Sequence, residues 1–200
     1  MPRLLSGRLC LDFVNTVDNR MDPASPDALS GPEALARWGH HVGLYDPARR
    51  DALLAWSATH PAQAAQIYQA ALELREVVYR VFVAVARQQV PNPDDLGRLQ
   101  QHHLEAMEHA DLIRNEEHYQ WTIAPDRLQV VPWQITQSAI GLLTGGPLER
   151  VKECLGCGDC GGLFVDGSKG QTRQWCSMEG CGSRAKMRRL YHKQRLAEEP

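Results

Sequence analysis

Five of the six cysteines in this 200-residue chain lie within 28 residues of one another, near the C-terminus. The chain contains no apolar run of the roughly 18 residues that a membrane helix needs, and its first residues do not resemble a signal peptide. We therefore expect a cytoplasmic protein without a membrane partner. In that compartment, clustered cysteines indicate a metal site rather than disulfides.

The spacing of these cysteines predicts one structural zinc ion. Structural zinc takes four ligands in a tetrahedron, and two close pairs of cysteines supply them. The preferred pairs are Cys157 with Cys160 and Cys176 with Cys181. Cys154 is an alternative to Cys157, because it also stands close before Cys160. The remaining cysteine, Cys10, lies in an apolar run and is expected to be a buried small residue.

Fifteen residues separate the two pairs. They hold a glycine-rich turn, residues 166–170, between two segments that favour strands, so we expect a β-hairpin that brings the pairs together. This tail is too polar and too rich in glycine to fold on an apolar core alone. The expected order of knuckle, hairpin and helix is treble-clef-like.

A basic helix is predicted after the last cysteine. Residues 184–196 contain six Lys or Arg and no acidic residue, and Ser183 is a suitable N-cap. Met187, Leu190 and Tyr191 form an apolar stripe that we expect to pack on the rest of the chain. The charges form either a solvated face or a nucleic-acid contact. The candidate nucleic-acid-binding residues are Arg184, Lys186, Arg188, Arg189, Lys193 and Arg195.

The segment before the cysteines is expected to be mostly helical. Its strongest amphipathic pattern covers residues 62–89, and a further helix should run from residue 94 to about residue 114. Alternating apolar residues on both sides of a Pro-Asp pair predict a small β-hairpin from residues 119–123 and 127–131. The predicted fold class is therefore mainly α with minor β.

The chain divides into two predicted domains, residues 1–148 and residues 149–200. The overall net charge of −2 indicates no partner. From Lys152 onward, however, there are nine basic and six acidic side chains. The C-terminal domain is thus a basic appendage to an acidic, helical N-terminal domain.

Several polar residues stand inside apolar segments of the N-terminal domain. Asp12, Asn15 and Thr16 interrupt an early apolar run, and Arg75 lies on the strongest helix, where it could pair with Asp12. Buried polar groups need partners, so these four residues form either an internal hydrogen-bond network or a pocket for a small-molecule effector. The sequence lacks a phosphate-binding loop, a zinc-protease motif and a nucleophile elbow, and we expect no enzyme.

Three segments resemble a known family. Residues 175–186, Trp-Cys-Ser-Met-Glu-Gly-Cys-Gly-Ser-Arg-Ala-Lys, resemble the CGNR zinc finger, and residues 160–166, Cys-Gly-Gly-Leu-Phe-Val-Asp, fit its earlier motif. Residues 7–16 are similar to the opening of the ABATE domain, which usually precedes that finger. This sequence differs at Ser183, where the family has Asn, and at Gly162, where Trp is common.

The resemblance implies a stress-induced transcription regulator of a mostly bacterial family. It also implies that Cys160, Cys176 and Cys181 are zinc ligands. We therefore expect a zinc-containing DNA-binding regulator, whose helical domain senses a signal or forms a homodimer. The alternatives are a zinc-stabilised module that binds another protein, and an RNA-binding protein.

Overall fold

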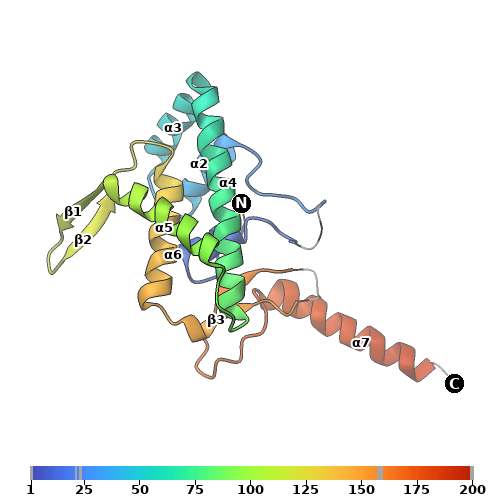
Figure 1. Cartoon of the computed structure of the whole chain (residues 1–200). Helices are drawn as coiled ribbons and strands as arrows, with labels where there is room; N and C mark the ends of the chain where they lie inside the picture. Colours follow the sequence, from blue (N-terminus) through green and yellow to red (C-terminus); the bar gives the residue numbers. More distant parts are fainter. Residues whose placement is uncertain (1, 21, 23, 157–159, 199–200) are drawn as a thin grey trace.

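The computed structural model describes residues 2–20, 22, 24–156 and 160–198 of the chain, with only the backbone of residues 192, 193 and 196–198 (Figure 1). A bundle of helices carries a small two-stranded hairpin at one side, and a long helix projects at the other (Figure 1). The helices are α1 Leu9–Val14, α2 Pro32–His41, α3 Pro47–Thr59, α4 Pro61–Ala86, α5 Pro93–Glu108, α6 Val130–Gly145 and α7 Ser183–Glu198. The remaining elements are the strands β1 Ala110–Arg114, β2 Tyr119–Ile123, β3 Val151–Glu153 and β4 Leu163–Val165, the 3-10 turn η1 Leu148–Arg150 and the π-helical turn η2 Met178–Gly182.

Proline marks the first turn of four helices, α2, α3, α4 and α5. Proline fits there because its missing N–H needs no partner and its fixed φ suits a helix. Two of these starts also have a side-chain cap: Asp46 accepts from the amide of Arg49, and Asn92 accepts from the amide of Asp94. These local signals account for the starts of these four helices.

The short helix α1 lies at the centre of the fold, where it contacts α4, α6 and β4. Its apolar side chains after Leu9 are completely buried, including Cys10, as expected, and Phe13, which packs on Trp38 at 5.0 Å between ring centroids. The long helix α4 presents its apolar face to α1, and Leu74, Val78 and related side chains have no exposed surface. The predicted mainly α architecture is confirmed.

The predicted hairpin of residues 119–123 with 127–131 is wrong in one of its strands. β2 pairs instead with β1, which precedes it, in the register Leu112 opposite Trp121. Helix α5 therefore ends at Glu108, and residues 110–114, expected to be helical, form the first strand. The turn is fixed by Asn115, whose side-chain oxygen accepts from the amide of His118 at 2.9 Å.

The strand pairing predicted inside the cysteine region is also wrong. β4 pairs antiparallel with β3, which precedes the first cysteines, and the segment before Trp175 forms no strand. Val151 and Leu163 of this small sheet are buried in the main core. The sheet therefore joins the cysteine region to the helical bundle, because Val151 and Leu163 lie next to the cysteines in sequence and are buried in the core of the bundle.

Hydrogen bonds reinforce this junction from the N-terminal side. The side chain of Asn15 at the end of α1 donates to the carbonyl of Leu163 at 2.7 Å and accepts from its amide at 2.9 Å. The carbonyl of Ser6 accepts from the amide of Val165 at 2.8 Å. Arg87, just after α4, pairs with Glu153 through two contacts of 2.8 and 3.0 Å. The N-terminal segment thus acts as an additional edge partner of β4.

We expect the substitution Asn15→Ala to lower the free energy of unfolding by about 2 kcal/mol, because both backbone groups of Leu163 lose their partners. Urea unfolding of the zinc-saturated protein measures the change. A change of less than about 0.5 kcal/mol would show that water replaces Asn15 without cost.

None of the helices within the described ranges has the length and apolar character that crossing a membrane requires.

Candidate functional site

Four cysteines from three separate segments converge at the end of the β3–β4 sheet. Cys154 follows β3, Cys160 precedes β4, Cys176 follows Trp175, and Cys181 lies within η2. Their sulfur atoms all lie within 4.8 Å of one another. None of these four residues forms a disulfide. The cluster is the only group of three or more potential metal ligands found in the part of the chain that the structure describes.

The geometry of this cluster fits one tetrahedral zinc ion. Zinc binds thiolate sulfur at about 2.3 Å, so two sulfurs of a tetrahedron stand about 3.8 Å apart. The Sγ of Cys176 lies 3.6 Å from that of Cys160 and 3.6 Å from that of Cys181. These distances are far longer than the roughly 2 Å of a disulfide bond. Four sulfurs this close together match the ligand set of a structural zinc site.

Backbone amides and one guanidinium donate to two of the sulfurs. The Sγ of Cys154 accepts from the amides of Gly156 at 3.3 Å and Cys176 at 3.2 Å. Hydrogen bonds from the neighbouring thiols of Cys160 and Cys176, together with these amides, lower the pKa of Cys154, whereas the contact with the Cys154 sulfur raises the pKa of Cys160 and of Cys176. The guanidinium of Arg184 donates to the Sγ of Cys181 at 3.3 Å. Such donors orient ligands and offset the negative charge of a four-thiolate site.

Gly156 is a residue of the site that the sequence analysis did not identify. A Cβ atom at this position would stand 2.5 Å from the Cβ of Cys181 and 2.8 Å from its sulfur. Only glycine allows the loop after Cys154 to cross so closely over Cys181. Its position two residues after a cysteine was the only available signal.

The fourth ligand was left open between Cys157 and Cys154. Cys160, Cys176 and Cys181 come together as predicted, and Cys154 completes the cluster. Cys157, the preferred candidate, lies outside the described residues. Cys154 is 7% exposed and packs with Cys181 against the buried ring of Phe164, so its sulfur is already enclosed in the site.

A network around Asp166 supports the loop between the cysteine pairs. Its fully buried carboxylate accepts from the ammonium of Lys152 at 2.6 Å, from the hydroxyl of Ser168 at 2.6 Å and from the amide of Arg173 at 3.0 Å. Burial raises the pKa of this carboxyl, but the hydrogen bonds from Lys152 and Ser168 outweigh it, and the net shift is downward. The Arg173 side chain also donates to the carbonyls of Leu5 and Cys176. The sequence analysis did not identify these roles.

Helix α7 begins directly after η2, the turn that contains the metal-site residue Cys181. The expected N-cap at Ser183 is wrong: Ser183 has helical angles, and its hydroxyl donates to the carbonyl of Met178. The cap is Ser177, whose side chain accepts from the amide of Gly180. The helical turn starts six residues earlier than expected because the π-turn η2 carries Cys181 into the cluster and continues into α7.

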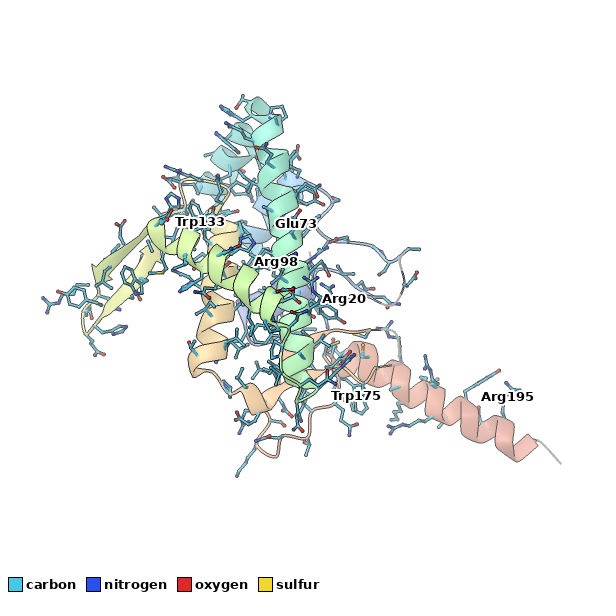
Figure 2. All side chains as sticks on the ribbon, in the orientation of Figure 1. Arg20, Glu73, Arg98, Trp133, Trp175 and Arg195 are labelled. Carbon is cyan, nitrogen blue, oxygen red and sulfur yellow. The ribbon has the colours of Figure 1, made fainter. Side chains whose placement is uncertain are left out.

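The side chains of α7 are exposed on all sides. Every described side chain from Lys186 to Arg195 is exposed, and the helix projects from the bundle with Arg195 at its outer part and Trp175 at its root (Figure 2). The predicted packing of the apolar stripe on the rest of the chain is therefore wrong. The exposed fractions are 64% for Met187, 51% for Leu190 and 66% for Tyr191.

The six candidate nucleic-acid residues do not have equivalent places on this helix. Lys186, Arg188, Arg189 and Arg195 are exposed along α7, whereas Arg184 is bonded to the sulfur of Cys181. The side chain of Lys193 lies outside the described residues. Arg184 thus connects the helix to the metal site, and the other described cations are placed further out.

The four polar residues predicted to form a network or an effector pocket are separated into three contacts. The predicted pair of Arg75 with Asp12 is wrong, because Arg75 binds both carboxylate oxygens of Asp27 at 2.9 and 2.7 Å. Arg75 also donates to the hydroxyl of Thr16 at 2.9 Å. Asp12 accepts from the amides of Leu5 and Ser6, and Asn15 bonds to β4 as described above. Asp27, the partner of Arg75, lies in a loop that is distant in the sequence. The helical pattern gave no indication of this contact.

Comparison with known families gives two matches that together cover most of the chain. The ABATE family model, with the description "Putative stress-induced transcription regulator", matches residues 7–146. The model of the CGNR zinc finger matches residues 150–194, which contain the four clustered cysteines and most of α7. No curated protein matches the sequence.

Proposed function

The chain belongs to the ABATE family and ends in a CGNR zinc finger, and from this premise we propose that it regulates transcription by binding double-stranded DNA through α7. The zinc ion is structural, because its four cysteine ligands leave no open coordination position for chemistry. When bound, it links the loop after β3, the start of β4 and η2, and so fixes the direction in which α7 leaves the finger. We assign the protein no catalytic step.

One observation carries the proposal: α7 is a basic helix whose described side chains beyond Ala185 are exposed on every side. A helix that only covers a core buries one face, and α7 does not. No acidic residue occurs between Glu179 and Glu198, so no negative charge lies among the basic side chains of the helix. Lysine and arginine side chains neutralise DNA phosphates and release counterions, which supplies most of non-specific affinity.

The main alternative is a module that binds an acidic protein. One version of it, in which α7 rests on the acidic N-terminal domain of the same chain, is disfavoured by the exposure of Met187, Leu190 and Tyr191. An acidic partner from another chain and an RNA partner both remain compatible with the charge of α7. The DNA proposal is preferred because the family description names a transcription regulator.

We expect the triple variant K186E/R189E/R195E to lose most DNA affinity. It leaves out Arg184, since changing that residue would disturb the zinc site, and Arg188, because this side chain lines a pocket together with Asp18 and Asn19. Removal of three phosphate contacts should reduce the slope of log K against log salt by about 3, with a loss on the order of a hundredfold at low salt. Fluorescence anisotropy of a labelled mixed-sequence duplex between 50 and 200 mM salt measures both quantities.

The matched control is R49E/R114E/R127E, which changes the formal charge equally at exposed positions away from α7. It should retain the wild-type slope. Equal losses in both variants would mean that overall charge, rather than α7, determines binding. Undiminished binding by the α7 variant would contradict the assignment of this helix to DNA.

A further inference from the structure

A stripe of four exposed side chains runs along α7 between its basic residues. Met187, Leu190, Tyr191 and Gln194 stand at positions i, i+3, i+4 and i+7, which fall on one face of an α-helix. All four are exposed. Three are apolar and none is charged, so the stripe has no use in a purely electrostatic contact with phosphate.

The basic residues flank this stripe on both sides. At about 100° of rotation per residue, Arg188 and Arg195 lie on one side of it, and Lys186 and Arg189 lie on the other. A helix with a central uncharged stripe between two cationic flanks matches a groove that has a phosphate chain on each wall and uncharged base edges at its floor.

The major groove of B-DNA has this form. It is about 12 Å wide and admits an α-helix, whose diameter with side chains is about 10–12 Å. The corresponding groove of an A-form RNA helix is too deep and narrow for side chains to read. The described side chains of α7 from Lys186 onward are exposed, so this outer part of the helix is accessible to a groove.

The chemistry of the stripe indicates which base pairs it would contact. Among the major-groove edges, only thymine presents an apolar group, the C5 methyl, which suits Met187, Leu190 and Tyr191. Gln194 has the amide that pairs with adenine N6 and N7. A second copy of α7 is a poor occupant, because each copy would bring six Lys or Arg to the contact.

We propose that α7 lies in the major groove of A·T-containing DNA, with its stripe of Met187, Leu190, Tyr191 and Gln194 against thymine methyls and adenine edges. This inference rests on the proposed function and specifies which double-stranded ligand α7 reads. Arg188 and Arg195 contact one phosphate wall of the groove, and Lys186 and Arg189 contact the other.

The test uses two alternating duplexes of about 20 base pairs that differ only in one methyl group per pair. One contains adenine and thymine, and the other has deoxyuridine at every thymine position. Each methyl group in contact contributes about fourfold in affinity, so the full-length protein should bind the thymine duplex on the order of tenfold more tightly. Anisotropy titration at one fixed salt concentration measures this ratio.

Two variants assign the preference to the stripe. M187Q/L190Q/Y191Q, which removes all three apolar side chains of the stripe, should bind both duplexes equally. L104Q changes another exposed leucine, 57% exposed on α5, and should keep the wild-type ratio.

The outcomes separate this inference from the function on which it rests. Equal binding of the thymine and deoxyuridine duplexes by the wild type overturns the inference and leaves DNA binding intact. A thymine preference that persists in M187Q/L190Q/Y191Q overturns the role of the stripe. Equal affinity for a double-stranded RNA of the same length overturns the major-groove geometry. Failure to bind any duplex at 50 mM salt overturns the proposed function itself, and binding to an acidic protein would then replace it.

Discussion

Replacing Cys154 by serine should leave the purified protein without stoichiometric zinc. The Cys157→Ser variant should keep one zinc ion per chain. Cys154 lies in the cluster of four sulfurs within 4.8 Å of one another, and its sulfur accepts two backbone amides. Structural zinc binds small domains with about 10–16 kcal/mol at neutral pH, and much of the folding free energy of such domains depends on it. Loss of one thiolate should therefore reduce zinc affinity by several orders of magnitude. Elemental analysis after dialysis measures the zinc content.

The two serine variants control for each other, because they make the same chemical change three positions apart. Near-ultraviolet circular dichroism adds a second readout, since Trp175 packs against the cysteine cluster. A protein that loses zinc in C157S and keeps it in C154S would identify Cys157 as the fourth ligand. Loss in neither variant would show that either thiol can complete the site.

The substitution Arg75→Leu should lower the free energy of unfolding by about 2–3 kcal/mol. The side chain of Arg75 is 6% exposed and pairs with Asp27, whose side chain is 32% exposed, and it also bonds to Thr16. Its removal leaves the partly buried carboxylate of Asp27 and the buried hydroxyl of Thr16 without these partners, and an unsatisfied buried group costs about 1–3 kcal/mol. Urea unfolding followed by far-ultraviolet circular dichroism measures the change.

The matched control is Arg37→Leu on α2, where the side chain is 53% exposed and its pair with Glu33 is separated by 3.6 Å. Exposed pairs of this type contribute at most about 1 kcal/mol, so R37L should be close to the wild type. A similar small effect of R75L would show that solvent or a rearranged loop satisfies Asp27, and that the buried network does not hold α1, α4 and the loop together.

The parts of the fold that depend on local chemistry were predictable from the sequence. Proline residues and capping residues such as Asp46 and Asn92 indicate where the helices start to within a few positions. The cysteine spacing predicts the zinc site, since close ligand pairs are a local requirement of tetrahedral coordination. The uninterrupted basic segment after Cys181 likewise predicts a charged helix.

The parts that depend on distant partners were not predictable. β4 could pair with the segment after it or with β3, and only the burial of Val151 and Leu163 in the main core decides for β3. Residues 110–114 have no pattern that separates a strand from a continued helix, and their role depends on pairing with β2. Asp27 reaches Arg75 from a loop 48 positions away, and no periodicity indicates such a contact.

The exposure of α7 shows a different limit of sequence patterns. An apolar stripe at helical spacing predicts that these side chains are buried in a contact. The contact is usually with the same chain, but the pattern does not distinguish the chain itself from another molecule. The sequence therefore identified Met187, Leu190 and Tyr191 as an apolar stripe, but its predicted packing on the rest of the chain is wrong, because all three side chains are exposed. Exposed apolar groups placed between charges indicate an external ligand.

Zinc K-edge X-ray absorption of the purified wild-type protein tests the central claim most directly. The account predicts one zinc ion per chain with four sulfur neighbours at about 2.3 Å and no nitrogen or oxygen in the first shell. A chain that carries no zinc, a first shell with fewer than four sulfurs, or cysteines joined as disulfides would contradict it, and α7 would then lack the support from which it is proposed to reach DNA.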